Sequence, residues 1–345
     1  MATTAAMEGT ETALGTHVRG LEGCMGVSEV RVAGGRVTAA LWDGGLAVCD
    51  ARCVAKRVAK HRTPRLGCCY VNGGADEVAS VCADGTVWCH DVICAEGRLL
   101  GVHDAGARCV RFVEERNLLV TGGWDKNILL WDLRETKHKE PVARVQLANK
   151  VYAMDAKENV LVVGCAGREV SLFDVRKSNE PWQRRESSLR AQTRAISVSQ
   201  DAKSFVMAAM DGRVAVEFAD PDEGIQAKKY AFKCHRENKA GEVIVHPVQA
   251  VAHHPRYHHT FVTGGADGCF SIWEGQQRKK LLQSERHPVA LSSICFNEHG
   301  TIMAVGTSRT GAFDQGNGVG ESIFIRQIDE AHVRPRARDQ PRGVA

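Results

Sequence analysis

The alternation of apolar and polar residues along the chain predicts short β-strands joined by tight turns. The clearest example is VTGGWDKNILLWDLR at residues 120–134, in which two apolar stretches flank a polar turn. Apolar runs of this length, bounded by glycine and aspartate, are typical of paired strands. The segment therefore predicts a strand, a tight turn and a second strand that ends in Trp-Asp.

This segment recurs along the chain. Related segments are TAALWDGGLAVCDAR from Thr38, ASVCADGTVWCHDV from Ala79, VVGCAGREVSLFDVR from Val162, MAAMDGRVAVEFADP from Met207 and VTGGADGCFSIWE from Val262. The acidic residues that end the first four repeats lie 41, 41 and 42 residues apart, at Asp50, Asp91, Asp132 and Asp174. A period of about 40 to 45 residues with a Trp-Asp ending is typical of a WD-repeat β-propeller, in which each repeat supplies one four-stranded blade.

We predict an all-β fold, a single seven-bladed WD-repeat propeller over residues 13–330. Six repeats are clear, and a weaker seventh begins at Ala304 with a Gly-rich loop between its strands. Single blades cannot bury both faces, so the ring must close, and we expect a strand at about residues 12–20 to complete the last blade. Residues 1–12 are expected to form a disordered extension. Residues 331–345, with four arginines among prolines, are expected to form a disordered basic tail, solvated rather than a localisation signal or nucleic-acid contact.

Composition is consistent with such a fold and constrains where the protein acts. The chain has 345 residues, 43% of them hydrophobic, with 34 glycines against 9 prolines, which suits a large core and many tight turns. The cysteine count of 13 is odd and no apolar signal-peptide segment follows the N-terminus, so we predict free thiols in a reducing compartment. No apolar run approaches the roughly 18 to 20 residues that cross a bilayer, and we expect no membrane partner.

Two repeats carry polar residues at the spacing of a hydrogen-bonded tetrad. The third repeat has His103, Thr121, Asp125 and Trp131, and the sixth repeat has Thr263, Asp267 and Trp273 at matching positions. A buried aspartate at a tight turn must be paired, and histidine, threonine and the indole N–H can satisfy it. We therefore predict a structural role for these residues rather than catalysis or metal binding.

Sequence motifs give no positive support for an enzyme. No phosphate-binding loop ends in Gly-Lys-Ser/Thr, and neither His-Glu-x-x-His nor a Gly-x-Ser-x-Gly elbow occurs. The GNGVGES run at residues 316–322 lacks the third glycine and the helix of a dinucleotide site, which favours a mobile hairpin loop. The HHPRYHH run at residues 253–259 falls where two strands of the sixth blade should join, which favours a turn over a metal site. We predict no catalytic residue, no metal site and no cofactor.

The closely spaced cysteine pairs are not arranged as a zinc site. Neither Cys49 with Cys53 nor Cys89 with Cys94 is joined by a second pair at zinc-ligand spacing. We predict that these cysteines are mostly small core residues.

Cations are concentrated between Trp182 and Arg236, although the net charge of the chain is only +4. WQRRESSLRAQTR places Arg194 at the start of a strand, DGRVAVEF places Arg213 directly after a turn, and KKYAFKCHR adds Lys229, Lys233 and Arg236. Neighbouring strands of about one and a half blades would bring these side chains onto one surface. Arginine offers a planar fork of donors and lysine a compact charge, which together suit an acidic or phosphorylated peptide. The alternative is a solvated face whose side-chain stems pack on the blade.

These three segments, taken with VTGGWDKNILLWDLR and GESIFIRQID, resemble the spindle-assembly-checkpoint WD-repeat protein of the Bub family (budding uninhibited by benzimidazole). The resemblance extends from about Val27 to Arg336. The messenger-RNA export propellers also carry a Phe-Lys-Cys-His-Arg run, but GRVAVEF and IFIRQID favour the checkpoint family. The N-terminal extension, the concentration of cysteines in the first two repeats and the arginine-rich tail depart from the family pattern.

The resemblance implies a non-enzymatic adaptor that delays anaphase. Its implied partners are a checkpoint kinase or pseudokinase of the Bub/Mad type that carries an acidic GLEBS motif, and a phosphorylated outer-kinetochore scaffold with MELT motifs. Arg194 and Arg236 match the family residues that contact the GLEBS motif. Arg213 and Lys233 match those that contact phosphothreonine, and Trp42 matches a residue that packs against the bound peptides.

The resemblance also implies a location in the nucleus and at the kinetochore with a cytoplasmic pool. It implies a link to the mitotic checkpoint complex and the anaphase-promoting complex, and nucleic acid is not among the expected ligands. The alternative, an export propeller that binds a GLEBS-bearing nuclear-pore protein, would have RNA as its second ligand.

Overall fold

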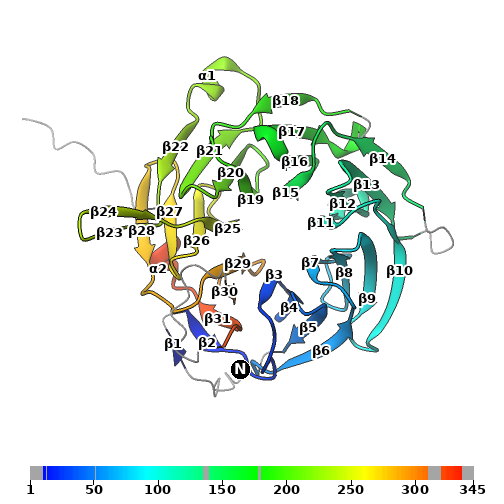
Figure 1. The fold of residues 1–345 in the computed structure, drawn as a ribbon. Helices are drawn as coiled ribbons and strands as arrows, with labels where there is room; N and C mark the ends of the chain where they lie inside the picture. Colours follow the sequence, from blue (N-terminus) through cyan, green and yellow to red (C-terminus); the bar gives the residue numbers. More distant parts are fainter. Residues whose placement is uncertain are drawn as a thin grey trace, which may run out of the picture.

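The computed structural model describes residues 11–12, 14–50, 52–134, 140–177, 180–309 and 320–335. Seven antiparallel sheets surround a central axis like the blades of a propeller (Figure 1). This arrangement confirms the predicted seven-bladed, nearly all-β fold. Residues 1–10 of the expected extension, the tail from residue 336 and the GNGVGES run up to residue 319 lie outside the described residues.

The first four blades each contain four consecutive strands, and in each the chain runs from the strand nearest the central axis to the strand at the rim (Figure 1). Blade one contains β3 (Val27–Ala33), β4 (Arg36–Leu41), β5 (Gly45–Cys49) and β6 (Ala55–Lys60). Blade two contains β7 (Arg65–Tyr70), β8 (Glu77–Cys82), β9 (Thr86–Asp91) and β10 (Glu96–Val102). Blade three contains β11 (Ala107–Val113), β12 (Leu118–Gly123), β13 (Asn127–Asp132) and β14 (Ala143–Gln146). Blade four contains β15 (Val151–Lys157), β16 (Val160–Cys165), β17 (Glu169–Asp174) and β18 (Gln183–Glu186).

The remaining three blades complete the ring. Blade five contains β19 (Thr193–Val198), β20 (Ser204–Ala209), β21 (Arg213–Phe218) and β22 (Tyr230–Lys233). Blade six contains β25 (Val248–His253), β26 (Thr260–Gly265), β27 (Phe270–Glu274) and β28 (Lys279–Gln283). Blade seven contains β29 (Leu291–Phe296), β30 (Ile302–Thr307), β31 (Ile323–Gln327) and, from the start of the chain, β2 (Gly15–His17) and β1 (Glu11–Thr12).

An N-terminal strand closes the ring, as the sequence predicts. β2 pairs antiparallel with β31, so that Thr16 lies opposite Ile325 and His17 opposite Phe324. β1 pairs in turn with β2, so paired structure begins at Glu11, inside the segment expected to be disordered. The two ends of the chain are therefore held in one blade.

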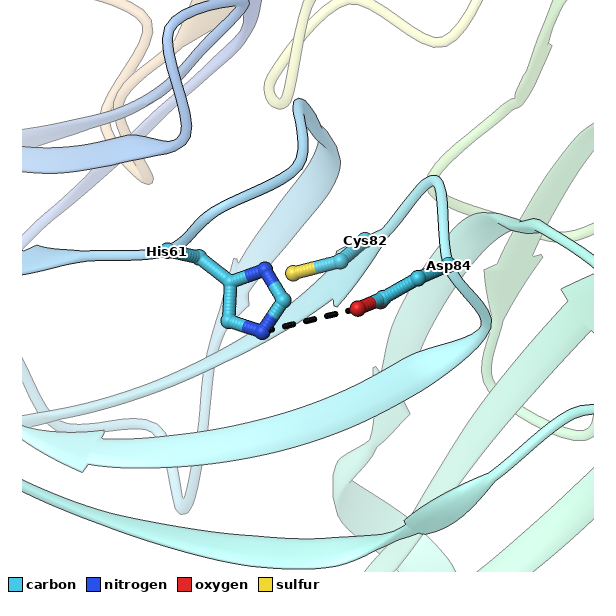
Figure 2. Close-up of side chains that lie close together, drawn as sticks. All are labelled: His61, Cys82 and Asp84. Atoms are coloured by element: carbon cyan, nitrogen blue, oxygen red, sulfur yellow. Dashed lines mark ion pairs between the residues drawn. The ribbon is translucent and has the colours of Figure 1, made fainter.

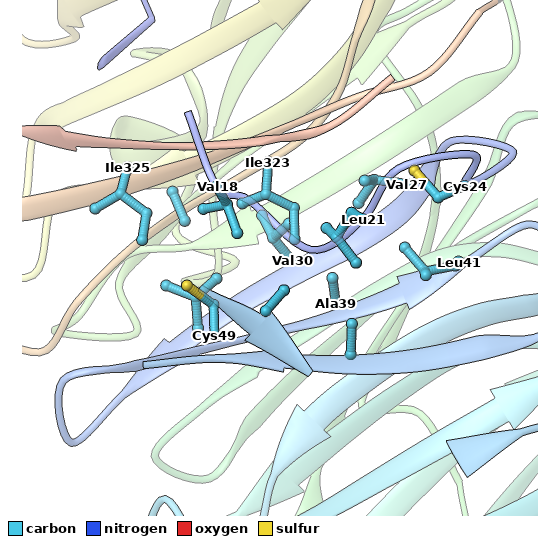
Figure 3. Close-up of a cluster of buried hydrophobic side chains, with 14 of the residues drawn as sticks. Val18, Leu21, Cys24, Val27, Val30, Ala39, Leu41, Cys49, Ile323 and Ile325 are labelled. Carbon is cyan, nitrogen blue, oxygen red and sulfur yellow. The ribbon is translucent and has the colours of Figure 1, made fainter. Parts of the chain in front are cut away.

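Apolar side chains fill the space between neighbouring blades. Figure 3 shows the cluster in which blade one packs against blade seven and the N-terminal segment. Its labelled members are Val18, Leu21, Cys24, Val27, Val30, Ala39, Leu41, Cys49, Ile323 and Ile325. Because the cluster joins residues from both chain ends, burial of apolar surface stabilises the closed ring.

Several short elements lie outside the regular blades. A hairpin of β23 (Arg236–Lys239) and β24 (Glu242–Val245) is inserted between blades five and six and projects from the rim (Figure 1). Helix α1 (Glu223–Gln226) lies between β21 and β22, and three 3-10 turns span Glu114–Arg116, Ala166–Arg168 and Val175–Lys177. No helix in the described part of the chain is long and apolar enough to cross a membrane.

Helix α2 (Glu330–Val333) corrects the expected start of the tail at residue 331. The Asp329 side chain caps this helix by accepting a hydrogen bond from the Ala331 N–H at 2.9 Å. Val333 is buried, and its carbonyl oxygen accepts the Thr260 hydroxyl at 2.9 Å. Burial of an apolar side chain therefore orders residues that composition alone places in the tail.

All thirteen cysteines lie in the described part of the chain, and no disulfide joins them there. Eleven are buried and Cys295 is partly buried, whereas Cys94 is exposed. Cys94 therefore departs from the expectation that the closely spaced cysteines lie in the core.

Candidate functional site

The cation-rich segments meet along one edge of blade five. Cα pairing joins Thr193 of β19 to Ala209 of β20, Ala209 to Arg213 of β21, and Arg213 to Lys233 of β22. Arg194 follows Thr193, at the end of this row that is nearest the central axis. The row crosses the blade from the axis to the rim, so cations from three separate segments lie on one face.

Asp211 organises the outer end of this row. Its Oδ2 lies 3.4 Å from Nε of Arg213, and its backbone carbonyl accepts a hydrogen bond from Nη2 of Arg236 at 3.2 Å. Lys233 is exposed and lies opposite Arg213 on the adjacent strand. The carboxylate of Asp211 pairs with Arg213 alone, so the group of Asp211, Arg213, Lys233 and Arg236 has a net positive charge.

The tetrad predicted for blade three is assembled by hydrogen bonds. His103 Nδ1 lies 3.0 Å from Asp125 Oδ1, and its Nε2 lies 2.8 Å from the Thr121 hydroxyl. Trp131 Nε1 donates to the same hydroxyl at 2.9 Å. Blade six repeats this geometry, with His235 of the KKYAFKCHR segment bonded to Asp267 and Thr263, and Trp273 donating to Thr263.

Blade five has a tetrad aspartate without the rest of the tetrad. Asp211 in Met-Asp-Gly-Arg stands where Asp125 stands in Trp-Asp-Lys-Asn, and strand pairing puts Met207 and Glu217 at the positions of the threonine and tryptophan. These side chains cannot form the same network. The carboxylate of Asp211 is instead available to hold Arg213.

A ring of bulged residues surrounds the central opening on the same face. Pairing between the innermost strand and the next strand is interrupted once in every blade, immediately after the first residue of the inner strand. The bulged residues are Ser28, Leu66, Arg108, Tyr152, Arg194, Gln249 and Ser292. A bulge re-aims the side chain of its extra residue. All of them except Leu66 line one cavity at the centre of the ring.

Arg194 is a partly buried cation without an acidic partner among the described residues. Its Nε donates to Gln249 Oε1 at 2.7 Å, and no carboxylate in the described part of the chain forms an ion pair with it. Desolvation and, to a smaller extent, the nearby charge of Arg108 together lower the pKa of Arg194 to about 10. A partly buried charge with a neutral partner is costly, so an incoming carboxylate would stabilise Arg194.

Arginines deeper in the central channel already have acidic partners. Arg111 lies 2.8 Å from Asp155 and 3.0 Å from Glu29, and Arg31 lies 2.5 Å from Glu29. The contrast with these paired side chains makes Arg194 the better candidate for binding an external anion.

Trp42 borders a pocket that also contains Arg194. The indole lies in the turn between β4 and β5, is 37% exposed, and shares a pocket of about 180 Å³ with Met25, Arg194 and Gln249. Met25 is 68% exposed, so apolar surface adjoins the partly buried Arg194 side chain.

The resemblance assigns Trp42, Arg213 and Lys233 to binding of the phosphorylated peptide, whereas the structure places Trp42 beside Arg194. Arg236, which the resemblance assigns to the acidic motif together with Arg194, instead contacts Asp211, as Arg213 does. The row on blade five therefore has an inner group at the central opening and an outer group near the rim.

Asp211 and Gln249 are the side chains that sequence reasoning missed. Both could be found by aligning the repeats, because Asp211 has no histidine partner and Gln249 occupies the bulge position next to that of Arg194 around the ring. Neither belongs to a motif on its own.

The HHPRYHH run forms the turn between β25 and β26, as the sequence favours. His253 Nδ1 lies 3.1 Å from the Ser197 hydroxyl, and burial lowers its pKa to about 4. His254 is buried, and its Nε2 lies 3.2 Å from the Gly300 carbonyl oxygen. These two imidazoles contribute to packing between strands.

Comparisons with known proteins agree with this architecture. The family model described as "WD domain, G-beta repeat" matches residues 97–132 and 238–274. The chain is 40% identical to mitotic checkpoint protein BUB3.1 of Arabidopsis thaliana over 72% of this chain and 73% of that protein. It is 38% identical to mitotic checkpoint protein bub-3 of Caenorhabditis elegans over 89% of this chain and 91% of that protein. It is 33% identical to the mRNA export factor GLE2 of Chaetomium thermophilum over 69% of this chain and 64% of that protein.

Proposed function

Because this chain belongs to the Bub3 family of mitotic checkpoint proteins, we propose that it is a spindle-assembly-checkpoint adaptor that binds two kinds of anionic peptide on one face. One ligand is the acidic GLEBS motif of a checkpoint kinase or pseudokinase. The other is a phosphothreonine MELT-type motif of the outer-kinetochore scaffold. The row of cations across blade five carries the proposal. We further propose that the protein acts in the nucleus and at the kinetochore, with a cytoplasmic pool, and catalyses no reaction.

The outer group suits a phosphorylated side chain. Phosphothreonine carries a charge of about −1.5 to −2 and three acceptor oxygens. Arg213 and Lys233 are paired across adjacent strands, whose Cα atoms lie roughly 4.5–5.5 Å apart, so both side chains can reach one phosphate. Asp211 holds Arg213 in place before the ligand arrives, which lowers the entropy lost on binding.

The inner group suits a carboxylate flanked by an apolar side chain. Arg194 can offer its guanidinium to a glutamate, and Trp42 and Met25 supply the adjoining apolar surface. Arg236 lies in the outer group, so an acidic segment that contacts both arginines must run along blade five from the opening toward the rim. The two ligands would then occupy neighbouring parts of one face.

Fluorescence-anisotropy titration with a MELT-type peptide, with and without threonine phosphate, tests the outer group. We expect phosphate-dependent binding to the wild type, weakened on the order of 10-fold to 100-fold by Arg213→Ala or Lys233→Ala, because each removes a charge-assisted hydrogen bond. Lys203→Ala is the matched control, since Lys203 is an exposed cation in the same blade at the turn between β19 and β20, on the opposite edge.

Equal binding of the two peptides would overturn the phosphothreonine assignment, and so would indifference to both substitutions. The inner group is tested separately with an acidic GLEBS-type peptide against Arg194→Ala and Arg194→Lys. We expect the lysine variant to recover only part of the affinity, because lysine lacks the planar fork of donors.

The similarity to the mRNA export factor GLE2 favours one alternative, in which RNA is the second ligand. Phosphate-backbone contacts release counterions, so RNA affinity would fall steeply with salt and would not require a threonine phosphate. Titrating a fluorescent single-stranded RNA at two salt concentrations distinguishes the cases. Strong, salt-sensitive RNA binding together with weak phosphopeptide binding would support the export function instead.

A further inference from the structure

Glycine is required between histidine and aspartate in the two complete tetrads. Gly123 ends β12 and pairs with the first residue of its inner strand, as Gly265 does in blade six. A Cβ atom on Gly123 would lie 2.5 Å from His103 Nδ1, and one on Gly265 would lie 2.5 Å from Asp267 Oδ1. Any side chain at this position would occupy the space in which the two partners meet.

Blade two has a cysteine at that position. Cys82 ends β8 and pairs with Arg65, the first residue of its inner strand, so it is the counterpart of Gly123. The flanking residues of the tetrad are retained as His61 and Asp84. Figure 2 shows the Cys82 sulfur directed toward the imidazole of His61, with the Asp84 carboxylate on the same side of the ring.

The hydrogen bond between histidine and aspartate is lost in this blade. His61 Nε2 lies 3.7 Å from Asp84 Oδ2, whereas Nδ1 of the corresponding histidine lies 3.0 Å and 2.9 Å from the aspartate in blades three and six. Asp84 Oδ2 is buried and accepts no hydrogen bond within the described ranges of the chain, although Nε of the exposed Arg62 lies 3.6 Å away. The histidine and the aspartate of this blade are therefore separated, and a buried thiol lies next to them that the other two tetrads lack.

We propose that His61, Cys82 and Asp84 bind a divalent transition-metal ion, with Zn²⁺ the best match to their chemistry. One ligand atom from each residue lies within 4.8 Å of the other two. Two ligand atoms about 2.0–2.1 Å from a tetrahedral Zn²⁺ lie roughly 3.3 Å apart, so 3.7 Å is too long for a hydrogen bond but near the spacing of a shared ion. A water molecule would supply the fourth ligand.

The surroundings of the three residues are compatible with metal binding. His61 Nδ1 lies 3.1 Å from the Thr63 hydroxyl and accepts the Thr63 backbone N–H at 3.3 Å. Metal binding through Nε2 therefore requires the other tautomer, in which the Nδ1–H donates to the Thr63 hydroxyl. Asp84 Oδ1 accepts the Thr86 hydroxyl at 2.7 Å, which orients the carboxylate. His61 and Asp84 remain about 15% exposed, so an ion can reach the site from solvent.

The balance of charge also permits the ion. Metal binding would release the thiol proton to solvent and form a bond between the metal and sulfur. The thiolate and the Asp84 carboxylate together supply two negative charges, which match a divalent ion.

The test uses the purified full-length chain, freed of metal by a chelator and titrated with Co²⁺ and then Zn²⁺. We expect one Co²⁺ per chain, seen as a thiolate-to-cobalt charge-transfer absorption that Zn²⁺ displaces, and a higher Tm with either ion. Cys82→Ser should abolish the absorption. Asp84→Asn should weaken binding by at least roughly tenfold, the smallest effect found even for groups that only support metal ligands.

Two further variants keep the result interpretable. Cys82→Gly gives blade two the glycine that separates histidine from aspartate in blades three and six, so it should fold, restore the hydrogen bond between His61 and Asp84, and bind no metal. Cys94→Ser removes an exposed thiol outside the cluster and should bind as the wild type does. The proposal is overturned if the wild type shows no such absorption, or if Cys82→Gly retains it.

Discussion

Single glycines decide whether a blade can form its tetrad. Gly123→Ala would place a methyl group 2.5 Å from His103 Nδ1 and separate the imidazole from Asp125. We expect the free energy of unfolding to fall by about 1–3 kcal/mol, since buried polar groups would lose their partners. Urea denaturation measures this loss. Gly74→Ala is the control, because a Cβ there meets no atom closer than 3.9 Å; equal destabilisation by both variants would contradict the explanation.

Acid should weaken the same network. Burial alone would raise the pKa of Asp125, but hydrogen bonds from His103 and Asn127 lower it to about 2. A carboxylate whose pKa is depressed by folding stabilises the protein above its unfolded pKa, and this contribution is lost as the pH falls from about 5 toward 2. Unfolding measured over this range should show a smaller pH dependence for Asp125→Asn than for the wild type. Asp104→Asn, at a side chain that is 75% exposed, should leave the profile nearly unchanged.

The sequence predicts the binding cations but not the side chains that hold them in place. The sequence indicates Arg194, Arg213, Lys233 and Arg236 because they cluster in the chain. The residues that hold these cations in place do not cluster with them in the sequence. Gln249, which binds Arg194, comes from the next blade, and Asp211, which binds Arg213, is recognised only as a tetrad aspartate without a tetrad. Contacts between blades are set by three-dimensional packing, which a linear motif does not record.

Among the strands, β2 is short, but we expect its removal to cause a large loss of stability because it closes the ring. Deleting residues 1–18 would expose the edge of β31 and remove Leu14 and Val18, both fully buried. Burying such side chains contributes about 1.5–3 kcal/mol each, so we expect a loss of roughly 3–6 kcal/mol and aggregation through the open edge.

Thermal unfolding and light scattering of two truncations would measure that effect. A chain lacking only residues 1–10 keeps β2 and should behave as the full-length protein does. If the longer deletion left the Tm unchanged, β2 would not be the element that stabilises the closed ring.

Regular elements were predictable because their pattern repeats, whereas the exceptions follow from local chemistry. The seven strand pairs with Trp-Asp or related endings mark the blades, and the closing strand follows from topology. The β23–β24 hairpin lies outside the repeat, and α2 depends on burial of Val333 against blade six, so neither has a periodic signal. The bulges become visible only when all seven inner strands are paired with their neighbours.

At the scale of the whole molecule, the packed blades shield most of the cysteine thiols from reagents in the solvent. Eleven of the thirteen cysteines are buried, and Cys94 is exposed. Alkylation of the native protein should therefore label about one thiol rapidly, whereas all thirteen should react after denaturation, because reaction requires an accessible thiolate. Mass spectrometry would identify the site. Cys94→Ser should remove the fast phase, and rapid labelling of several other cysteines would show that the blades open readily.

Pairing of β2 with β31 also determines when the protein can finish folding during its synthesis. The closing strand is translated near the start and its partner near the end, so at about 5–20 residues per second roughly 15–60 s separate the two. Throughout this interval Thr16 and His17 lack the strand with which they pair, and Leu14 and Val18 lack the apolar contacts that β31 supplies. A nascent chain released before Ile323 would carry six finished blades and still lack a closed ring.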